Sequence, residues 1–133
     1  MKEPTIHVLQ IEPHKHPQRV MLQNDLDSLQ KAVSIGSDYQ GLIELVWLED
    51  GALILCNEEG KLNGLEPNRR IGDDILCGVF YVVSEDDEGN LASLSPAIID
   101  KYAHLFWEPD EGISQAEVDA SIFVNFSDTM LNA

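Results

Sequence analysis

Four stretches of the chain carry the alternation, or the unbroken run, of apolar residues that is typical of β-strands. They are residues 6–11, 42–48, 52–56 and 75–83. The last stretch contains nine residues without a charge, which predicts a central, buried strand. Gly78 lies within it, where a glycine often marks a bulge or a close approach by another part of the chain.

The Asp-Gly pair at residues 50–51 separates two of these apolar runs and predicts a β-hairpin. The prediction follows because both central residues of a type I′ turn need positive φ. A pairing of Glu49 with Ala52 would place Glu44 opposite Asn57. Both faces of the hairpin are then largely apolar, so we expect both strands to be covered on both sides.

Apolar residues at helical spacing predict helices in two other regions. Leucine, alanine and valine recur in this way between residues 26 and 33, with Asn24 or Asp25 available as the N-cap. Ser95 followed by Pro96 predicts the start of a second helix, because serine caps a helix well and proline is favoured at its first position.

Ser114 and Glu117 have the spacing of a capping box ahead of a third helix, although residues 121–126 could form a strand instead. Together the elements predict an α+β fold: a single small domain with a mixed or antiparallel sheet of about four strands and two or three helices packed on it. Residues 1–108 would form this domain, and residues 109–133 would be a C-terminal helical extension.

The chain is strongly acidic, with 24 Asp and Glu residues, 8 Lys and Arg residues and a net charge of -16. This balance argues against direct nucleic-acid binding, which needs a positive face, and permits a protein partner with a basic surface. Cys56 and Cys77 lie in apolar runs, so we expect buried free thiols in a reducing compartment. We find neither a secretory signal nor a membrane span, and expect a cytoplasmic protein without membrane contact.

The polar segment 57–70 is the candidate site because three of the eight basic residues lie in it, beside glycines that allow a close approach to a ligand. Its amide and guanidinium groups could bind a small anion or a nucleotide-like ligand. The candidate ligand-binding residues are Asn57, Lys61, Asn68 and Arg69, and the supporting glutamates are Glu44, Glu58 and Glu59.

A purely structural role for the same residues is the alternative. Asn57 and Asn68 could hold the segment in place through side-chain to backbone bonds, and Arg69 could pair with one of the supporting glutamates. His14 and His16 form an i, i+2 pair that could face one metal ion, but no third ligand lies nearby in the sequence. We therefore assign no metal site, no catalytic residue and no cofactor.

The run Asn57–Leu62, followed by Asn68-Arg69, resembles the signature of the bacterial "domain of unknown function 3846" family of phages and mobile elements. The similarity extends loosely to the strand before this run and to Asp74–Gly78 after it, and it covers residues 5–108. The resemblance implies a cytoplasmic protein of phage or mobile-element type and supplies no catalytic residue.

Three functions are consistent with the sequence. The first is a non-enzymatic binding or interaction module with an anion-binding segment at residues 57–70. The second is an acidic mimic of DNA that inhibits a host nucleic-acid enzyme, which predicts carboxylates along one extended face. The third is a small enzyme acting on a nucleotide-like anion through Lys61 and Arg69, which requires a concave pocket beside both residues.

Overall fold

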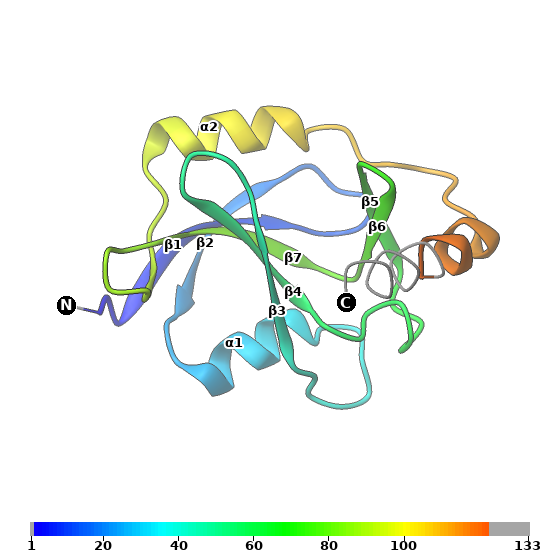
Figure 1. Ribbon diagram of the computed structural model, residues 1–133, viewed down its shortest axis with the longest axis horizontal. Coiled ribbons are helices and arrows are strands. Elements are labelled where there is room, and N and C mark those ends of the chain that lie inside the picture. Colours follow the sequence, from blue (N-terminus) through cyan, green and yellow to red (C-terminus); the bar gives the residue numbers. More distant parts are fainter. Residues whose placement is uncertain (1, 123–133) are drawn as a thin grey trace, which may run out of the picture.

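The computed structural model describes residues 2–122, and it places one helix on each face of an antiparallel sheet (Figure 1). The strands are β1 (Thr5–Ile11), β2 (Gln18–Gln23), β3 (Ile43–Trp47), β4 (Ala52–Asn57), β5 (Pro67–Ile71), β6 (Asp74–Cys77), β7 (Phe80–Glu85) and β8 (Leu91–Ala92). The helices are α1 (Leu26–Val33) and α2 (Pro96–Leu105), and residues 115–122 are helical as well.

The main sheet has the order β2-β1-β7-β4-β3, with β8 paired to β7, and β5 pairs with β6 in a separate two-stranded sheet. All the strand pairs are antiparallel. These findings confirm the α+β fold, although the main sheet has six strands and not about four.

Two apolar cores, one on each face of the sheet, hold the helices in place. All six residues of β4 are buried. Because side chains alternate along a strand, Leu53 and Leu55 pack toward α1, whereas Ile54 and Cys56 pack toward α2. Replacing such a core leucine or isoleucine with alanine typically costs about 2–5 kcal/mol, so this strand is the foundation of both layers.

The predicted helix starts are confirmed. The Asp25 carboxylate accepts a hydrogen bond from the backbone N–H of Ser28 at 2.8 Å, and the Ser95 hydroxyl accepts one from Ile98 N–H at 3.3 Å. Each bond satisfies one of the backbone donors that a helix leaves unpaired in its first turn. Pro96 occupies the first turn of α2, as expected.

The third helix begins where the capping box predicts it, since Ser114 Oγ accepts a hydrogen bond from Glu117 N–H at 3.1 Å. Residues 121 and 122 are helical, and the rest of the alternative strand at 121–126 lies outside the described residues. The division of the chain after residue 108 stays a prediction. Among the described residues, no helix is long and apolar enough to cross a membrane.

The apolar run 75–83 is not one strand, as predicted, but two. Gly78 has a φ of +81°, which directs the chain away from the sheet, and a Cβ there would lie 2.7 Å from Leu65 Cδ1. The residues before it form β6, which pairs with β5, and those after it form β7 at the centre of the main sheet. Both halves are buried, so hydrophobicity alone could not separate them.

The apolar pattern of the sequence did not predict three of the strands, β2, β5 and β8. β2 reads as polar because it is the outer strand on one side of the sheet and is held to β1 through its backbone. β5 lies inside the segment interpreted as a loop, and β8 has only two residues.

The hairpin forms as predicted, but its register is shifted by one residue. Asp50 and Gly51 have φ of +60° and +74°, and Ala52 N–H donates to the Glu49 carbonyl at 3.1 Å. Leu48 N–H, however, donates to the Ala52 carbonyl at 2.9 Å, which leaves Glu49 as an extra residue, as in a β-bulge. Glu44 therefore lies opposite Cys56, and the predicted pairing with Asn57 is wrong.

The expectation that both hairpin strands are covered holds for β4 and is wrong for β3. β4 is the only strand that pairs with β3 among the described residues, so β3 is an outer strand. Two hydrogen bonds show which residues direct their backbone groups toward β4. Leu48 N–H donates to the Ala52 carbonyl, and Glu58 N–H donates to the Leu42 carbonyl. Because this direction alternates along an antiparallel strand, Leu45 and Trp47 direct theirs outward.

A pair of proline variants tests this assignment. Leu45→Pro removes an N–H that faces away from β4, so its stability should match that of Leu45→Ala within about 0.5 kcal/mol. Val46→Pro removes a bond to β4 and leaves the buried Ile54 carbonyl without its partner. Its free energy of unfolding should therefore be about 1–3 kcal/mol lower than that of Leu45→Pro. Urea unfolding of the three variants measures both effects, and equal losses from the two prolines would show that the assignment is wrong.

Candidate functional site

The segment 57–70 runs from the last residue of β4 into β5 and is held by hydrogen bonds within the loop between them. Asn63 N–H donates to the Glu59 carbonyl at 2.8 Å, and Leu65 N–H donates to the Gly60 carbonyl at 3.0 Å. A Cβ on Gly60 would lie 2.7 Å from the Cys77 carbonyl oxygen, so the chain passes too close to β6 for any side chain there. The segment therefore has a fixed shape, which divides its predicted site residues between two places.

The first place is a cavity of about 190 Å³ beside the ends of β3 and β4. Its polar lining includes Glu44, Glu58, Lys61 and Asp74. The Lys61 ammonium forms an ion pair with Asp74, whose carboxylate also accepts the N–H of Ile75. Three carboxylates surround this one ammonium group, so the cavity carries an excess of negative charge.

The electrostatics of Glu44 reflect that excess. Burial, together with the carboxylates of Asp74 and Glu58, raises the pKa of Glu44 above its ordinary value, and Lys61 opposes this only in part. Glu44 takes part in none of the ion pairs formed by the described residues. The cavity is thus better suited to a cation than to the anion expected from the sequence.

The two cysteines also line this cavity. Both are buried free thiols, as expected, and burial raises the pKa of Cys56 to about 12 and that of Cys77 to about 11. Both therefore remain protonated at neutral pH, which makes them poor nucleophiles. The Cys56 thiol lies 3.7 Å from the Glu44 carbonyl oxygen across the strand pair.

Asn57 contributes to the shape of the segment. Its side-chain oxygen accepts a hydrogen bond from Glu59 N–H at 2.9 Å, and the residue is 6% exposed. Its amide nitrogen has no hydrogen-bond partner among the described residues and lies so close to Gly41 that a Cβ there would come within 2.6 Å. This arrangement agrees with the structural alternative for Asn57. Glu59 itself is exposed and does not line the cavity.

Asn68 and Arg69 lie in the second place, away from the cavity that Lys61 lines, and both are fully buried. The Asn68 amide donates to the carbonyls of Ile11 and Gly78 at 2.9 and 2.8 Å. It therefore links β5 to the end of β1 and to the turn before β7. This is the side-chain to backbone role that the sequence left as an alternative.

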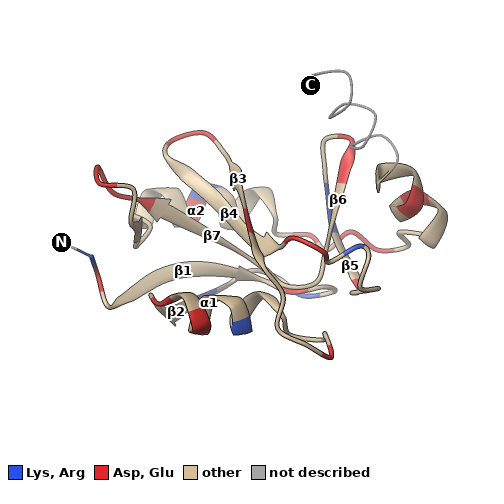
Figure 2. Cartoon of the chain, turned by 60° about the horizontal axis from the view of Figure 1, so that its bottom comes forward, with Lys and Arg blue, Asp and Glu red and all other residues tan. Residues whose placement is uncertain are grey.

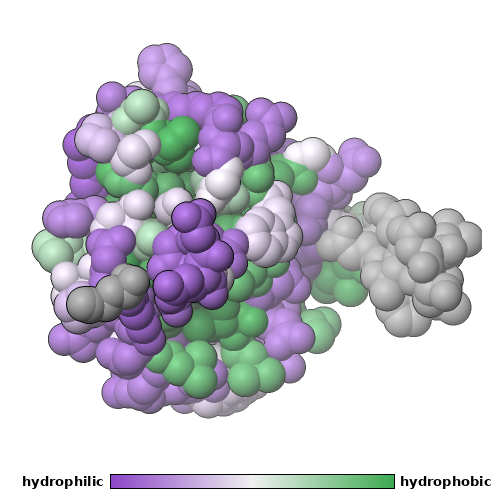
Figure 3. Space-filling model, turned by 60° about the vertical axis from the view of Figure 1, so that its left-hand side comes forward, coloured by the Kyte–Doolittle hydropathy of each residue, from purple (hydrophilic) through white to green (hydrophobic). Residues whose placement is uncertain are grey.

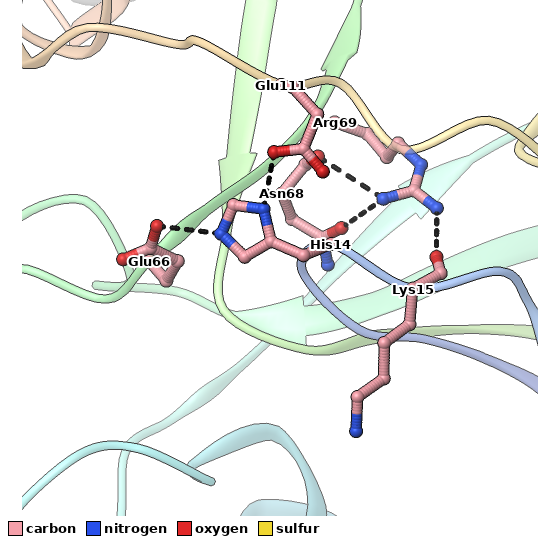
Figure 4. Close-up of polar contacts among 6 residues, drawn as sticks. All are labelled: His14, Lys15, Glu66, Asn68, Arg69 and Glu111. Carbon is pink, nitrogen blue, oxygen red and sulfur yellow. Dashed lines mark hydrogen bonds and ion pairs between the residues drawn. The ribbon is translucent and has the colours of Figure 1, made fainter.

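The Arg69 guanidinium is held by oxygen atoms of the protein. Its donors reach the Phe106 carbonyl at 3.0 and 3.3 Å. They also reach the Lys15 carbonyl at 2.7 Å and the Asn68 side-chain oxygen at 2.8 Å (Figure 4). Burial lowers the pKa of Arg69, although Asp110 and Glu111 act in the opposite direction. Arg69 ties the loop after β1 and the end of α2 to β5, and it forms none of the ion pairs expected with the supporting glutamates.

A histidine clasp lies beside Arg69. His14 Nδ1 is 2.7 Å from Glu111 Oε2, and His14 Nε2 is 2.9 Å from Glu66 Oε1 (Figure 4). Each carboxylate is a hydrogen-bond acceptor, so the geometry favours the doubly protonated ring. His16 is used separately, with its ring stacked on Trp107 at 4.2 Å.

The outer edge of β3 is a feature that the sequence did not reveal. Leu45 and Trp47 are 43% and 66% exposed, and both lie on the α1 side of the sheet, opposite Leu55 and Leu53. The surface is not uniformly polar: Figure 3 shows hydrophobic side chains among hydrophilic ones over one side of the molecule. No sequence signal marks this edge, because the apolar residues of β3 resemble those of a covered strand.

A family model described as "Domain of unknown function (DUF3846)" matches residues 6–107. The chain belongs to this family. The match confirms the resemblance seen in the sequence and spans α1, α2 and the whole main sheet of the DUF3846 domain except the first residue of β1. No curated protein and no solved structure matches the chain.

Adjacent arginines of the DUF3846 domain provide a matched test of the anchor. Arg69→Ala removes several charge-assisted bonds to buried carbonyls and should lower the free energy of unfolding by at least about 3 kcal/mol. Arg70 is partly exposed and pairs with Glu117, so Arg70→Ala should change stability little. Denaturant unfolding measures both variants. Equal, small effects would contradict the anchoring role of Arg69.

The histidine clasp should make stability depend on pH. The hydrogen bonds to Glu66 and then Glu111 raise the pKa of His14 above the value of about 6.5 for an unfolded chain. Its contribution to stability is therefore fully present below about pH 6.5 and is lost as the pH rises through the higher folded value. The difference in unfolding free energy between the wild type and His14→Gln should shrink over that range. An NMR titration that places the pKa of His14 at or below 6.5 would contradict this.

Proposed function

We propose that this domain is a non-enzymatic interaction module, which recognises a partner protein by accepting an extended segment of it as a further strand beside β3. The observation that supports the proposal most directly is the open, apolar edge of β3. Leu45 and Trp47 direct backbone groups that are unpaired among the described residues toward the position of such a segment, and their exposed apolar side chains lie on the α1 face beside it.

Strand addition uses the groups that this edge offers. Main-chain hydrogen bonds provide affinity, and contacts with alternate side chains provide specificity. Natural proteins usually protect an open edge with charged residues, proline or a bulge; Ile43–Trp47 contains no proline and no bulge, since Glu49 lies beyond the strand, and its one charged residue is Glu44. The opposite edge, β2, is polar, with Gln18, Arg19 and Gln23 along it, and is a poorer fit for an apolar strand.

The anion-binding function has less support, because the basic groups of segment 57–70 already have partners. Lys61 pairs with Asp74, Arg69 binds backbone carbonyls, and Arg70 pairs with Glu117. The same division disfavours an enzyme acting on a nucleotide-like anion through Lys61 and Arg69, since the two residues do not share a pocket.

The DNA-mimic function is disfavoured by the distribution of charge. Figure 2 shows acidic residues at hairpin turns and in loops on several sides of the chain, rather than in a row along one face. The origin in a phage or mobile element and the cytoplasmic location stay predictions. An interaction module that engages a protein of the host cell would fit both.

A peptide-display selection tests the proposal. Randomised peptides are selected on the wild-type protein, and the enriched sequences are then measured against Leu45→Pro and Leu45→Ala. Both variants lose the leucine side chain, but only the proline also loses the outward N–H. We expect Leu45→Pro to weaken binding at least about tenfold, the equivalent of 1.4 kcal/mol, and Leu45→Ala to weaken it less.

Met21→Ala is the matched control, since Met21 is an exposed apolar residue on the opposite edge strand. It should leave binding unchanged. A failure to enrich any peptide, or enriched peptides that bind Leu45→Pro as well as the wild type, would refute the proposal.

A further inference from the structure

Glu44 places a carboxylate on the open strand itself. Because side chains alternate along β3, Glu44 points to the face opposite that of Leu45 and Trp47, the face on which it meets Cys56. There it lines the cavity of about 190 Å³ together with Glu58, Lys61 and Asp74. The α1 side of the open edge is thus apolar, whereas its α2 side carries one carboxylate, Glu44, ahead of Val46 and Leu48, which pack against the core.

Glu44 has no ion-pair partner among the described residues. Lys61 is held by Asp74. A positively charged group arriving from outside would therefore meet a carboxylate that is not already neutralised. The cavity is also more than ten times the 10–15 Å³ or so that admits a water molecule, so it has room for the end of a long side chain.

Building on the proposed function, we infer that the partner segment carries a basic residue opposite Glu44, with apolar residues on either side of it. Side chains directly opposite one another on neighbouring strands share a face of the sheet. The apolar residues of the segment would then lie beside Leu45 and Trp47. A lysine or arginine between them would lie beside Glu44, with its charged end in the cavity.

The net charge of the chain decides between the candidate occupants of the edge. At -16, two copies of this chain repel each other, and an acidic strand would meet the same repulsion beside Glu44. The negative charge of the chain attracts a basic segment before contact, which raises the rate of association. The occupant is therefore a basic partner and not a second copy of the chain.

Three peptides of one length, in which valine alternates with lysine, threonine or glutamate, test the inference by fluorescence anisotropy at low ionic strength. The lysine peptide should bind the wild type most tightly and the glutamate peptide least tightly. Glu44→Gln, which keeps the shape of the side chain, should weaken binding of the lysine peptide about fivefold and leave that of the threonine peptide unchanged. Glu59→Gln is the matched control: it makes the same change in net charge outside the cavity and should have no such effect.

The outcomes separate this inference from the proposed function. If all three peptides bind equally and Leu45→Pro abolishes binding, the charge preference is refuted and strand addition stands. If the lysine peptide binds Leu45→Pro as tightly as the wild type, attraction is non-specific and both proposals fail. The inference is also overturned if none of the peptides binds, or if sedimentation shows a wild-type dimer that Leu45→Pro abolishes, because the occupant would then be a second copy.

Discussion

The structure depends on one asymmetry in its sheet: β4 has a neighbouring strand on each side, whereas its hairpin partner β3 has only one among the described residues. The apolar residues of β4 fill both cores, so the hairpin cannot leave the sheet without exposing them. β3 is therefore held firmly by a buried strand, while its own outer backbone groups have no partner in the described part of the chain. A rigid template of this kind is what strand addition requires, because little order must be created on binding.

A second constraint explains why the basic residues of segment 57–70 do not form an anion site. Arg69 is a buried cation whose partners are backbone carbonyls from the loop after β1 and from the end of α2. Its charge serves to join both parts of the chain to β5. The cavity at the other end of the segment is lined by one ammonium group and three carboxylates. It therefore suits a positively charged ligand, whereas the sequence predicted a negatively charged one.

The sequence predicted what depends on local chemistry. Asp25 and Ser95 cap their helices, and Asp50 and Gly51 form the turn, because each signal acts within a few residues. It could not predict contacts that depend on distant parts of the chain. The acceptors of Arg69 lie 54 and 37 residues away, at Lys15 and Phe106. The apolar residues of β3 were interpreted as covered on both sides, because hydrophobicity does not reveal whether a strand has one neighbour or two.

Amide hydrogen exchange along β3, followed residue by residue by NMR, tests the open edge most directly. The account predicts fast exchange at Leu45 and Trp47, whose N–H groups face outward, and slow exchange at Val46 and Leu48, whose N–H groups are bonded to β4. Adding a peptide that binds should slow exchange at the first two residues only. Equal protection of all four amides in the free protein would show that the edge is already occupied and would contradict the account.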